Sequence, residues 1–261
     1  MKFAIYQMDV IPANPEANKA KIIDWMETEL VQDVDTVVLP EMWNAGYALD
    51  QLEEYADKDG RDIVPFLKNL AKQHDKHIIA GSIANKREDG IYNTSYIITK
   101  QGELIHQYDK MHLVPMLDEH VFLQAGKEKG KIFELDGMKI GVVICYDLRF
   151  PELMRSLALL GAEVIIVVAQ WPTSRRVHWH YLQYARAIEN QCYIISANSS
   201  GECNGTQFAG ESYVIEPTGK LVTEGPKEKE ATIIAEIDRD IVTQFRKDIP
   251  IFKSRVPHLY E

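Results

Sequence analysis

The fold of this chain is decided by residues 141–152, which read Gly141-Val142-Val143-Ile144-Cys145-Tyr146-Asp147-Leu148-Arg149-Phe150-Pro151-Glu152. The β-branched run before Cys145 predicts a buried strand, and Pro151-Glu152 predict a helix that runs to about Leu160. A cysteine at such a junction has the position of a nucleophile, because backbone N–H groups near a helix start favour a thiolate and bind an oxyanion. The alternative is an ordinary buried thiol, the common fate of a lone cysteine.

The composition is that of an ordinary soluble globular protein, with 261 residues, of which 46% are hydrophobic and 26% are charged. The net charge of -10 argues against nucleic acid and against a membrane surface as partners, because both attract basic proteins. A small-molecule substrate is therefore expected. The sequence has no evident boundary between two domains, so we expect one domain over residues 1–261, in which residues 249–261 form a C-terminal arm.

The cysteines and the apolar segments indicate a reducing compartment. The three cysteines, Cys145, Cys192 and Cys203, have no paired spacing, which argues against a disulfide framework and a zinc site. We expect Cys192 in the core and Cys203 exposed in a glycine-rich loop. The N-terminal segment reaches Asp9 before a signal-type apolar region develops, and no later apolar run approaches membrane-spanning length. These features predict a cytoplasmic protein.

Strands alternate with amphipathic helices along the rest of the chain. A helix is predicted to begin at Asn14-Pro15-Glu16 and to bury one apolar stripe, and a second helix is predicted over 61–75. This order predicts a mixed sheet with helices outside, and strands that are apolar on both faces predict two sheets packed face to face. The first stripe comprises Ala20, Ile23, Met26 and Leu30, and the predicted strands cover residues 2–9, 35–40, 77–83, 92–98, 162–169, 192–198 and 231–237.

Three chemically useful side chains follow predicted strands. Glu41 comes after the strand at 35–40, Lys110 ends the strand before Met111, and Cys145 ends the strand described above. The carboxyl ends of strands form the edge where α/β active sites gather, so the three groups could perform acyl transfer together. Glu41 as a solvated loop carboxylate and Lys110 as a solvated amine are the alternatives, since both residue types are mostly exposed.

The loop Asp118-Glu119-His120 raises the alternative of a metal site. Adjacent residues do not all face one ion without unusual backbone geometry, and no second group of ligands has matching spacing. We therefore expect neither a metal nor a cofactor.

The three strand ends carry motifs that resemble the nitrilase superfamily of carbon-nitrogen hydrolases. The resemblance covers nearly the whole chain and rests on Pro40-Glu41, on residues 108–113 and on residues 144–152. It implies a four-layer α-β-β-α sandwich and a homodimer formed by helices that follow the cysteine and by the segment 186–190. By resemblance, Glu41 is the general base, Lys110 and the backbone N–H of Tyr146 stabilise the oxyanion, Cys145 is the nucleophile, and Glu119 holds the lysine, which replaces the metal interpretation.

Further segments are similar to bacterial omega-amidases, which hydrolyse the terminal amide of 2-oxo acids such as 2-oxoglutaramate. They are residues 116–120, Trp171-Pro172 with Arg175, and His178-Trp179; Thr173-Ser174 and the added charge of Arg176 depart from the pattern. A substrate with a carboxylate needs a local cation, and Trp171 and Arg175 are the predicted substrate-binding residues. Arg176 is the nearby alternative, Arg149 is expected to pair with a structural carboxylate, and Arg175 as a surface residue stays open.

Three functions follow from these observations. An omega-amidase comes first, and another amidase or an N-carbamoyl hydrolase of the same superfamily comes second. A non-catalytic oligomeric binding protein that has kept the fold comes third, and the intact set of Glu41, Lys110, Glu119 and Cys145 argues against it.

Overall fold

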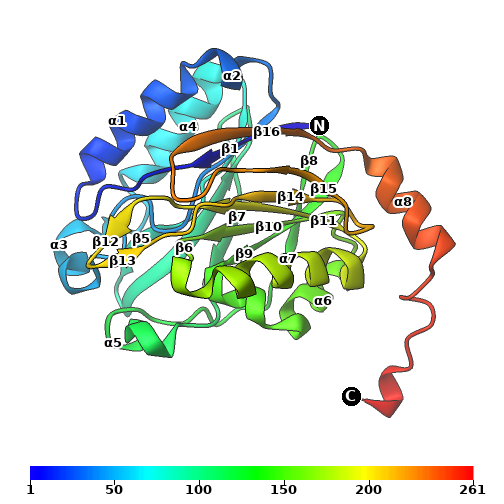
Figure 1. Cartoon of the computed structure of the whole chain (residues 1–261). Helices are drawn as coiled ribbons and strands as arrows, with labels where there is room; N and C mark the ends of the chain where they lie inside the picture. Colours follow the sequence, from blue (N-terminus) through cyan, green and yellow to red (C-terminus); the bar gives the residue numbers. More distant parts are fainter. Residues whose placement is uncertain (261) are drawn as a thin grey trace.

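The computed structural model describes residues 1–260, and it has four layers in which two sheets pack face to face between two layers of helices (Figure 1). This arrangement confirms the predicted α-β-β-α sandwich. The helices α1 (Pro15–Met26), α2 (Glu29–Gln32) and α4 (Ile63–His74) lie on one side, and α6 (Pro151–Leu159) and α7 (Arg176–Asn190) lie on the other side.

The first sheet contains strands from both ends of the chain. Its edge strand comes from near the C-terminus and pairs antiparallel with the first strand of the chain. A further strand, β7 (Leu104–Asp109), pairs with β6. The order of the remaining strands is β16 (Ala231–Glu236), β1 (Lys2–Gln7), β2 (Thr36–Val38), β4 (His77–Ile79), β6 (Gly90–Ile98), β5 (Ile83–Arg87) and β3 (Asp57–Lys58).

The second sheet carries the stretch that decides the fold. Its strand β9 runs parallel to β10 and delivers Cys145 to the sheet edge. Three short elements lie outside the two large sheets and the long helices: α3 (Leu52–Tyr55), α5 (Glu119–Phe122) and the hairpin of β12 (Glu202–Cys203) and β13 (Thr206–Gln207). The order of the second sheet is β15 (Leu221–Glu224), β14 (Tyr213–Ile215), β11 (Tyr193–Asn198), β10 (Val164–Ala169), β9 (Met138–Ile144) and β8 (Ile132–Leu135).

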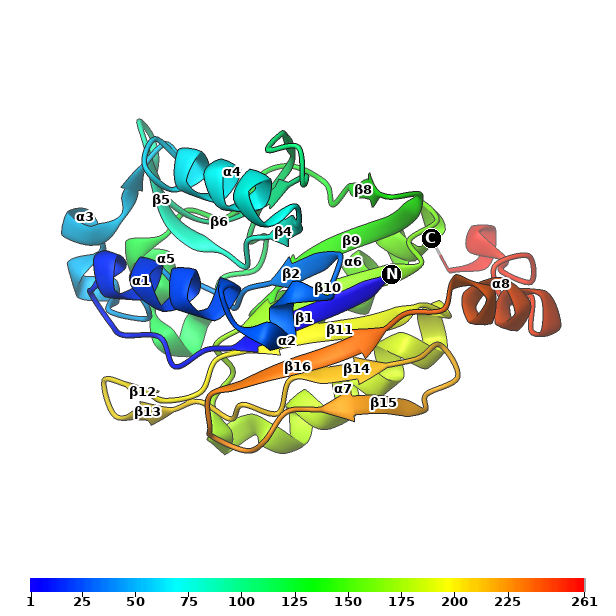
Figure 2. The ribbon, with the colours of Figure 1, turned by 90° about the horizontal axis from the view of Figure 1, so that it is seen from above.

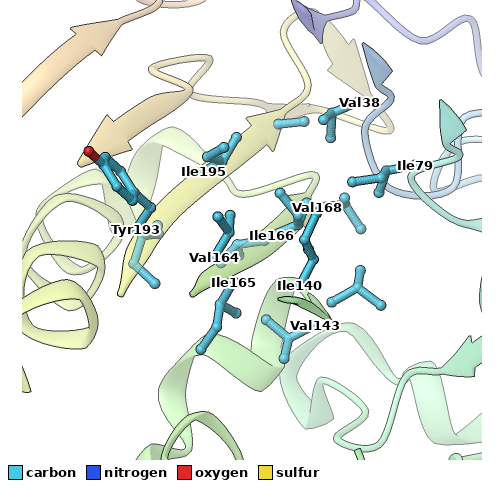
Figure 3. Close-up of a cluster of buried hydrophobic side chains, with 14 of the residues drawn as sticks. Val38, Ile79, Ile140, Val143, Val164, Ile165, Ile166, Val168, Tyr193 and Ile195 are labelled. Atoms are coloured by element: carbon cyan, nitrogen blue, oxygen red, sulfur yellow. The ribbon is translucent and has the colours of Figure 1, made fainter. Parts of the chain in front are cut away.

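The main core lies between the two sheets. Val38 and Ile79 of the first sheet share one buried cluster with Val143 and Ile195 of the second sheet (Figure 3). Strands must be apolar on both faces because the second face of each sheet is covered by helices. In β1, Phe3 and Ile5 belong to this cluster, whereas Ala4 and Tyr6 belong to the cluster under α1 and α4.

The predicted apolar stripe of the first helix is wrong in part. The helix α1 ends at Met26, and Ala20, Ile23 and Leu30 are exposed, while Ile22 and Trp25 are buried with Met26. The Trp25 ring stacks on Tyr6 with 4.5 Å between ring centroids. A large aromatic ring buries more area than an alanine or an isoleucine, so Trp25 decides which side of the helix faces the sheet.

The predicted strand over 77–83 is two strands, β4 and β5, which are separated at Gly81. Gly81 has φ +58°, and a Cβ there would lie 1.9 Å from the carbonyl oxygen of Pro40. The backbone thus passes so close to the residue before Glu41 that only glycine fits. This contact helps to fix the segment that carries Glu41.

The end of the chain contains a helix that the sequence analysis did not predict. The helix α8 (Arg239–Asp248) begins at Asp238, whose side chain accepts a hydrogen bond from the Asp240 N–H. It lies beside the sandwich, at the side of the two sheets (Figure 2). The single domain with an arm at 249–261 stays a prediction. Among residues 1–260, the helices are all too short or too polar to cross a bilayer.

Candidate active site

The three predicted strand ends meet in one buried cluster. Lys110, which follows β7, places its Nζ 3.0 Å from Glu41 Oε1 and 2.8 Å from Glu119 Oε1. Glu41 follows β2 in the same sheet, whereas Cys145 follows β9 in the other sheet. Glu41, Lys110 and Glu119 have no exposed surface, and Cys145 is 5% exposed. The site therefore lies where the carboxyl ends of strands from the two sheets come together.

Glu41 is held by four side-chain and backbone contacts besides Lys110. Asn93 Nδ2 donates to Glu41 Oε1 at 2.9 Å, and the Gln170 N–H donates to Oε2 at 2.8 Å. Gln170 Nε2 also donates to the Glu41 carbonyl at 2.8 Å. The Tyr47 hydroxyl lies 2.9 Å from Glu41 Oε1 and 2.8 Å from Glu119 Oε1. These contacts keep the carboxylate in one orientation, as a proton-transfer group requires.

Tyr47, Asn93 and Gln170 are residues of the site that the sequence analysis did not predict. Tyr47 had a weak signal, since it belongs to the aromatic loop that follows Glu41. Asn93 lies inside the strand β6, and Gln170 follows β10 on the second sheet. Their role depends on pairing between strands that are distant in the sequence, so a local pattern does not reveal it.

Burial and charge work in opposite directions on Lys110. Burial alone lowers the pKa of its ammonium group, but the carboxylates of Glu41 and Glu119 outweigh burial and raise the pKa well above its usual range. Lys110 is therefore charged at neutral pH. A fixed ammonium group beside a nucleophile is suited to stabilise an oxyanion.

The state of Cys145 differs from the sequence-based expectation. Burial, and then the charge of Glu41, raise the pKa of the Cys145 thiol well above its usual value. The backbone after Cys145 forms only a 3-10 helix over Cys145–Arg149, and the longer helix α6 begins at Pro151. This short helix start does not outweigh desolvation, so the resting cysteine is a neutral thiol that needs a base.

Asp147 holds the backbone turn that carries Cys145, which has φ +48°. Asp147 Oδ2 accepts from the Ile144 N–H at 3.0 Å and from the Tyr108 hydroxyl at 2.7 Å. Asp147 Oδ1 accepts from the His112 N–H at 3.0 Å. A left-handed backbone is unfavourable for cysteine, and this buried carboxylate supplies the contacts that maintain it.

The loop that carries Glu119 does not converge on a metal position. Glu119 points into the buried cluster, and its Oε2 accepts from the Val114 N–H at 2.8 Å, whereas Asp118 and His120 are exposed. Within residues 1–260, His, Cys, Asp and Glu side chains form no group of three or more that could hold a metal ion.

A small pocket of about 80 Å³ opens onto Cys145. The Trp171 indole N–H donates to the Arg175 carbonyl at 2.9 Å, so these two predicted substrate-binding residues meet beside the cysteine. Tyr47 and Gln170 also line a neighbouring pocket of about 320 Å³. The lining of the small pocket comprises Tyr47, Val114, Met116, Leu117, Cys145, Tyr146, Arg149, Gln170, Trp171, Pro172 and Arg175.

Two expectations about arginines are corrected by the structure. Arg149 has no carboxylate partner among residues 1–260; its guanidinium lies 4.6 Å from the Trp171 ring centroid and lines the pocket. Arg176 is 2.5 Å from Glu211 Oε2 and 2.5 Å from Glu228 Oε1, so it is engaged elsewhere. The tertiary structure places the Arg149 guanidinium beside an aromatic ring and the Arg176 guanidinium beside two carboxylates, and the sequence alone does not reveal either arrangement.

The other two cysteines are buried. Cys192 is 0% exposed, which confirms its predicted place in the core. Cys203 is 5% exposed, so the prediction of an exposed residue is wrong. It lies in the hairpin of β12 and β13, which lines the neighbouring pocket, and this packing covers the thiol.

The four-layer fold and the buried Glu-Lys-Cys cluster define a hydrolase that acts on the carbon–nitrogen bonds of amides. The chain belongs to the carbon-nitrogen hydrolase family, whose model matches residues 2–247. The predicted resemblance to the nitrilase superfamily is thereby confirmed.

Relatives and solved structures of this family cover nearly the whole chain. A protein named 2-oxoglutaramate amidase from Bacillus subtilis is 43% identical, with 100% of each chain covered. A protein named "Hydrolase in agr operon" from Staphylococcus lugdunensis is 54% identical over 88% of this chain and 98% of its own length. The crystal structure of Saccharomyces cerevisiae Nit3, a nitrilase-superfamily member, has a TM-score of 0.85 at 32% identity and covers 96% of this chain and 94% of its own.

Proposed function

We propose that the protein is an omega-amidase that hydrolyses the terminal amide of a small 2-oxo acid amide, such as 2-oxoglutaramate, to the acid and ammonia. The observation that carries the proposal is the buried contact of Lys110 with Glu41 and Glu119 beside Cys145. The similarity to the Bacillus subtilis 2-oxoglutaramate amidase supports the choice of substrate.

In the first half of the reaction, Cys145 Sγ attacks the amide carbon while Glu41 accepts the thiol proton. The oxyanion that forms faces the Lys110 ammonium group and the Tyr146 N–H. The C–N bond then breaks, and Glu41 donates its proton to the departing nitrogen. Ammonia leaves, and the acyl group remains on Cys145 as a thioester.

In the second half, water attacks the thioester carbon and Glu41 accepts a proton from the water. A second oxyanion forms in the same place, the C–S bond breaks, and Glu41 returns the proton to the sulfur. Glu119 and Tyr47 keep Lys110 and Glu41 in position through both halves. The reaction needs neither a metal nor a cofactor.

The end of the substrate that does not react carries a carboxylate. Trp171 and Arg175 line the pocket beside Cys145, and we assign them to this end. The described residues include no acidic side chain within ion-pair distance of Arg175, so its guanidinium is available for an anion. The whole chain has a net charge of -10, which repels an anionic substrate. A local cation such as Arg175 is therefore needed to bind the substrate carboxylate.

Ammonia release from a panel of amides tests the proposal. We expect 2-oxoglutaramate to have a higher kcat/KM than neutral linear amides and N-carbamoyl compounds. A preference for another amide or for an N-carbamoyl compound would favour the second candidate from this superfamily. No ammonia release from any compound would favour the non-catalytic binding protein.

We also propose that the enzyme is a cytoplasmic homodimer formed by α6 and α7. The outer face of these helices carries large apolar side chains that are exposed in the single chain, which is typical of an interface. They are Leu159 (45% exposed), Leu160 (53%), Val177 (64%), Tyr181 (67%) and Ile188 (48%).

A further inference from the structure

We propose that the neighbouring pocket of about 320 Å³ is a binding site for the ammonium ion, through which the nitrogen released from the amide leaves the enzyme. The inference rests on the proposed function and deepens it, because it assigns a separate place to the second product. The ligand class is a small monovalent cation that carries N–H donors.

The neighbouring pocket adjoins the catalytic groups. Tyr47 and Gln170 line both this pocket and the small pocket that opens onto Cys145. The Tyr47 hydroxyl and the Gln170 N–H contact the Glu41 carboxylate at 2.9 Å and 2.8 Å. In the proposed reaction Glu41 gives a proton to the departing nitrogen, so ammonia forms beside the wall that the two pockets share. Ammonia that reaches water takes a proton from the solvent and becomes ammonium at neutral pH, as other amines do.

The neighbouring pocket opens to solvent at one end of the sandwich. Asp50 belongs to the 3-10 turn Leu49–Gln51, and Asp118 directly precedes α5. Both residues are exposed and line the pocket. The helices α3 and α5 and the hairpin of β12 and β13 lie at the same end of the molecule in both views (Figure 1, Figure 2). The pocket therefore gives a product a way out that does not pass through the small pocket.

The two pockets carry opposite charge. The neighbouring pocket is lined by the carboxylates of Asp50 and Asp118 and, among the described residues, by no Lys, Arg or His. Neither carboxylate has a hydrogen bond or an ion pair within residues 1–260. Arg149 and Arg175 line the small pocket instead. The small pocket therefore attracts the anionic end of a substrate, and the neighbouring pocket attracts a cation.

A buried acceptor without a partner lies in the wall between the two pockets. Gln170 is 2% exposed, and its Nε2 donates to the Glu41 carbonyl at 2.8 Å, which identifies the other amide atom as the oxygen. This Oε1 atom has no hydrogen-bond partner among the described residues, and such an orphaned acceptor indicates a missing donor. Ammonium offers N–H donors only. The rings of Tyr47 and Phe208, whose centroids are 6.3 Å apart, add aromatic faces that attract a cation.

The first experiment measures inhibition of the wild type by ammonium chloride, with sodium chloride at equal concentration as the reference and formation of the 2-oxo acid as the readout. We expect ammonium to inhibit more strongly than sodium. In Asp50→Asn combined with Asp118→Asn, the inhibition constant for ammonium should rise by about fivefold or more, since two charges that attract the cation are removed. Asp24→Asn combined with Asp33→Asn is the matched control, because it changes the net charge equally at exposed carboxylates of the outer helical layer. Its inhibition constant should equal that of the wild type.

The second experiment measures binding without turnover, by thermal unfolding of Cys145→Ala. Ammonium chloride should raise Tm by about 2 °C or more relative to sodium chloride once the cation is well above its dissociation constant, because a ligand that binds only the folded state stabilises it. The difference should disappear when Asp50→Asn and Asp118→Asn are added and should remain with the control pair. Independence of either effect from the two aspartates would overturn the inference, and so would the absence of any effect specific to ammonium.

The two experiments separate this inference from the proposed function. If the wild type hydrolyses no 2-oxo acid amide, the proposed substrate is wrong, but a Tm difference that depends on Asp50 and Asp118 still supports the ammonium site. If the wild type hydrolyses 2-oxoglutaramate and the effects of ammonium do not depend on these aspartates, the function stands and the ammonium site fails.

Discussion

At the scale of single residues, the proposed mechanism requires Glu41 to remove the proton of Cys145, because the resting cysteine is a neutral thiol. Burial and the charge of Glu41 hold the pKa of Cys145 above its usual range, so little thiolate is present at neutral pH.

Cys145→Ala is expected to abolish turnover and leave the fold intact, since only one sulfur atom at a pocket is removed. Intact-protein mass spectrometry should show an acyl adduct of the wild type during turnover. Iodoacetamide should label Cys145 before Cys192, because Cys192 is fully buried. The labelling rate should keep rising at a pH above that at which an ordinary cysteine has reached its full rate, because a raised pKa moves thiolate formation to higher pH. Wild-type ammonia release by Cys145→Ala would rule out the thioester.

Glu41 and Lys110 should act as one unit, because they are in contact and serve the same proton and the same oxyanion. Glu41→Gln keeps the shape but removes the base, and we expect kcat to fall by about 100-fold to 10,000-fold. The double variant Glu41→Gln with Lys110→Ala should be scarcely slower than the single variants. Rate losses that add in the double variant would show that the two residues serve different steps.

Lys110→Ala should also reduce stability, because it leaves the buried carboxylates of Glu41 and Glu119 without their cation. The loss is expected to be about 3–5 kcal/mol, as for other buried charges that lose one partner. Chemical denaturation measures it, and Glu41→Gln is the control, since it removes a charge without leaving an unpaired one on Lys110, which keeps Glu119. Equal stability of the two variants would contradict this account.

Arg175→Ala should raise KM for 2-oxoglutaramate by about tenfold, which corresponds to one charge-assisted hydrogen bond. The reason is that Arg175 binds the remote carboxylate about equally in the ground state and the transition state, so kcat changes less. Steady-state kinetics with 2-oxoglutaramate and with an uncharged amide provide the comparison. An unchanged KM for 2-oxoglutaramate would remove Arg175 from the binding site.

At the scale of secondary-structure elements, the turn between β9 and α6 is maintained by Asp147, which reaches β7 through Tyr108. Asp147→Asn places an amide NH₂ group against N–H and O–H donors, so at least one contact is lost. We expect stability to fall by about 1–3 kcal/mol and kcat to fall with little change in KM. Thermal unfolding and steady-state kinetics measure both effects.

Asp33→Asn is the matched control for Asp147→Asn. Asp33 is an exposed carboxylate that contacts Lys2 on the surface, so its variant should retain wild-type kcat and stability. An Asp147→Asn variant that also keeps wild-type kcat would show that the turn does not need this carboxylate.

At the scale of the whole molecule, the exposed apolar face of α6 and α7 predicts the homodimer. Tyr181→Asp combined with Ile188→Asp introduces charges into that face and should weaken dimerisation by about 30-fold or more. Light scattering over a range of protein concentrations measures the change. Leu30→Asp is the control, because Leu30 is 59% exposed on the opposite helical layer. A monomeric wild type would contradict the proposed interface.

The chain by itself determined the elements that carry the chemistry. The β-branched runs before Glu41 and Cys145 and the strand before Lys110 specify where each strand ends, because strand formation follows a local pattern. The motifs at these ends were sufficient to predict the four-layer fold by resemblance. The same local pattern was insufficient for α1, where the rotation of the helix depends on how Trp25 packs against Tyr6.

Only the tertiary structure decided which groups meet and in which state. Glu41 receives a hydrogen bond from Gln170, which is 129 positions away, and such a contact depends on how two sheets pack. The raised pKa of Cys145 and the position of the Arg149 guanidinium against the Trp171 ring have the same origin. Charge states and ion-pair partners depend on burial and distance in three dimensions, and both are set by long-range packing instead of by neighbours in the sequence.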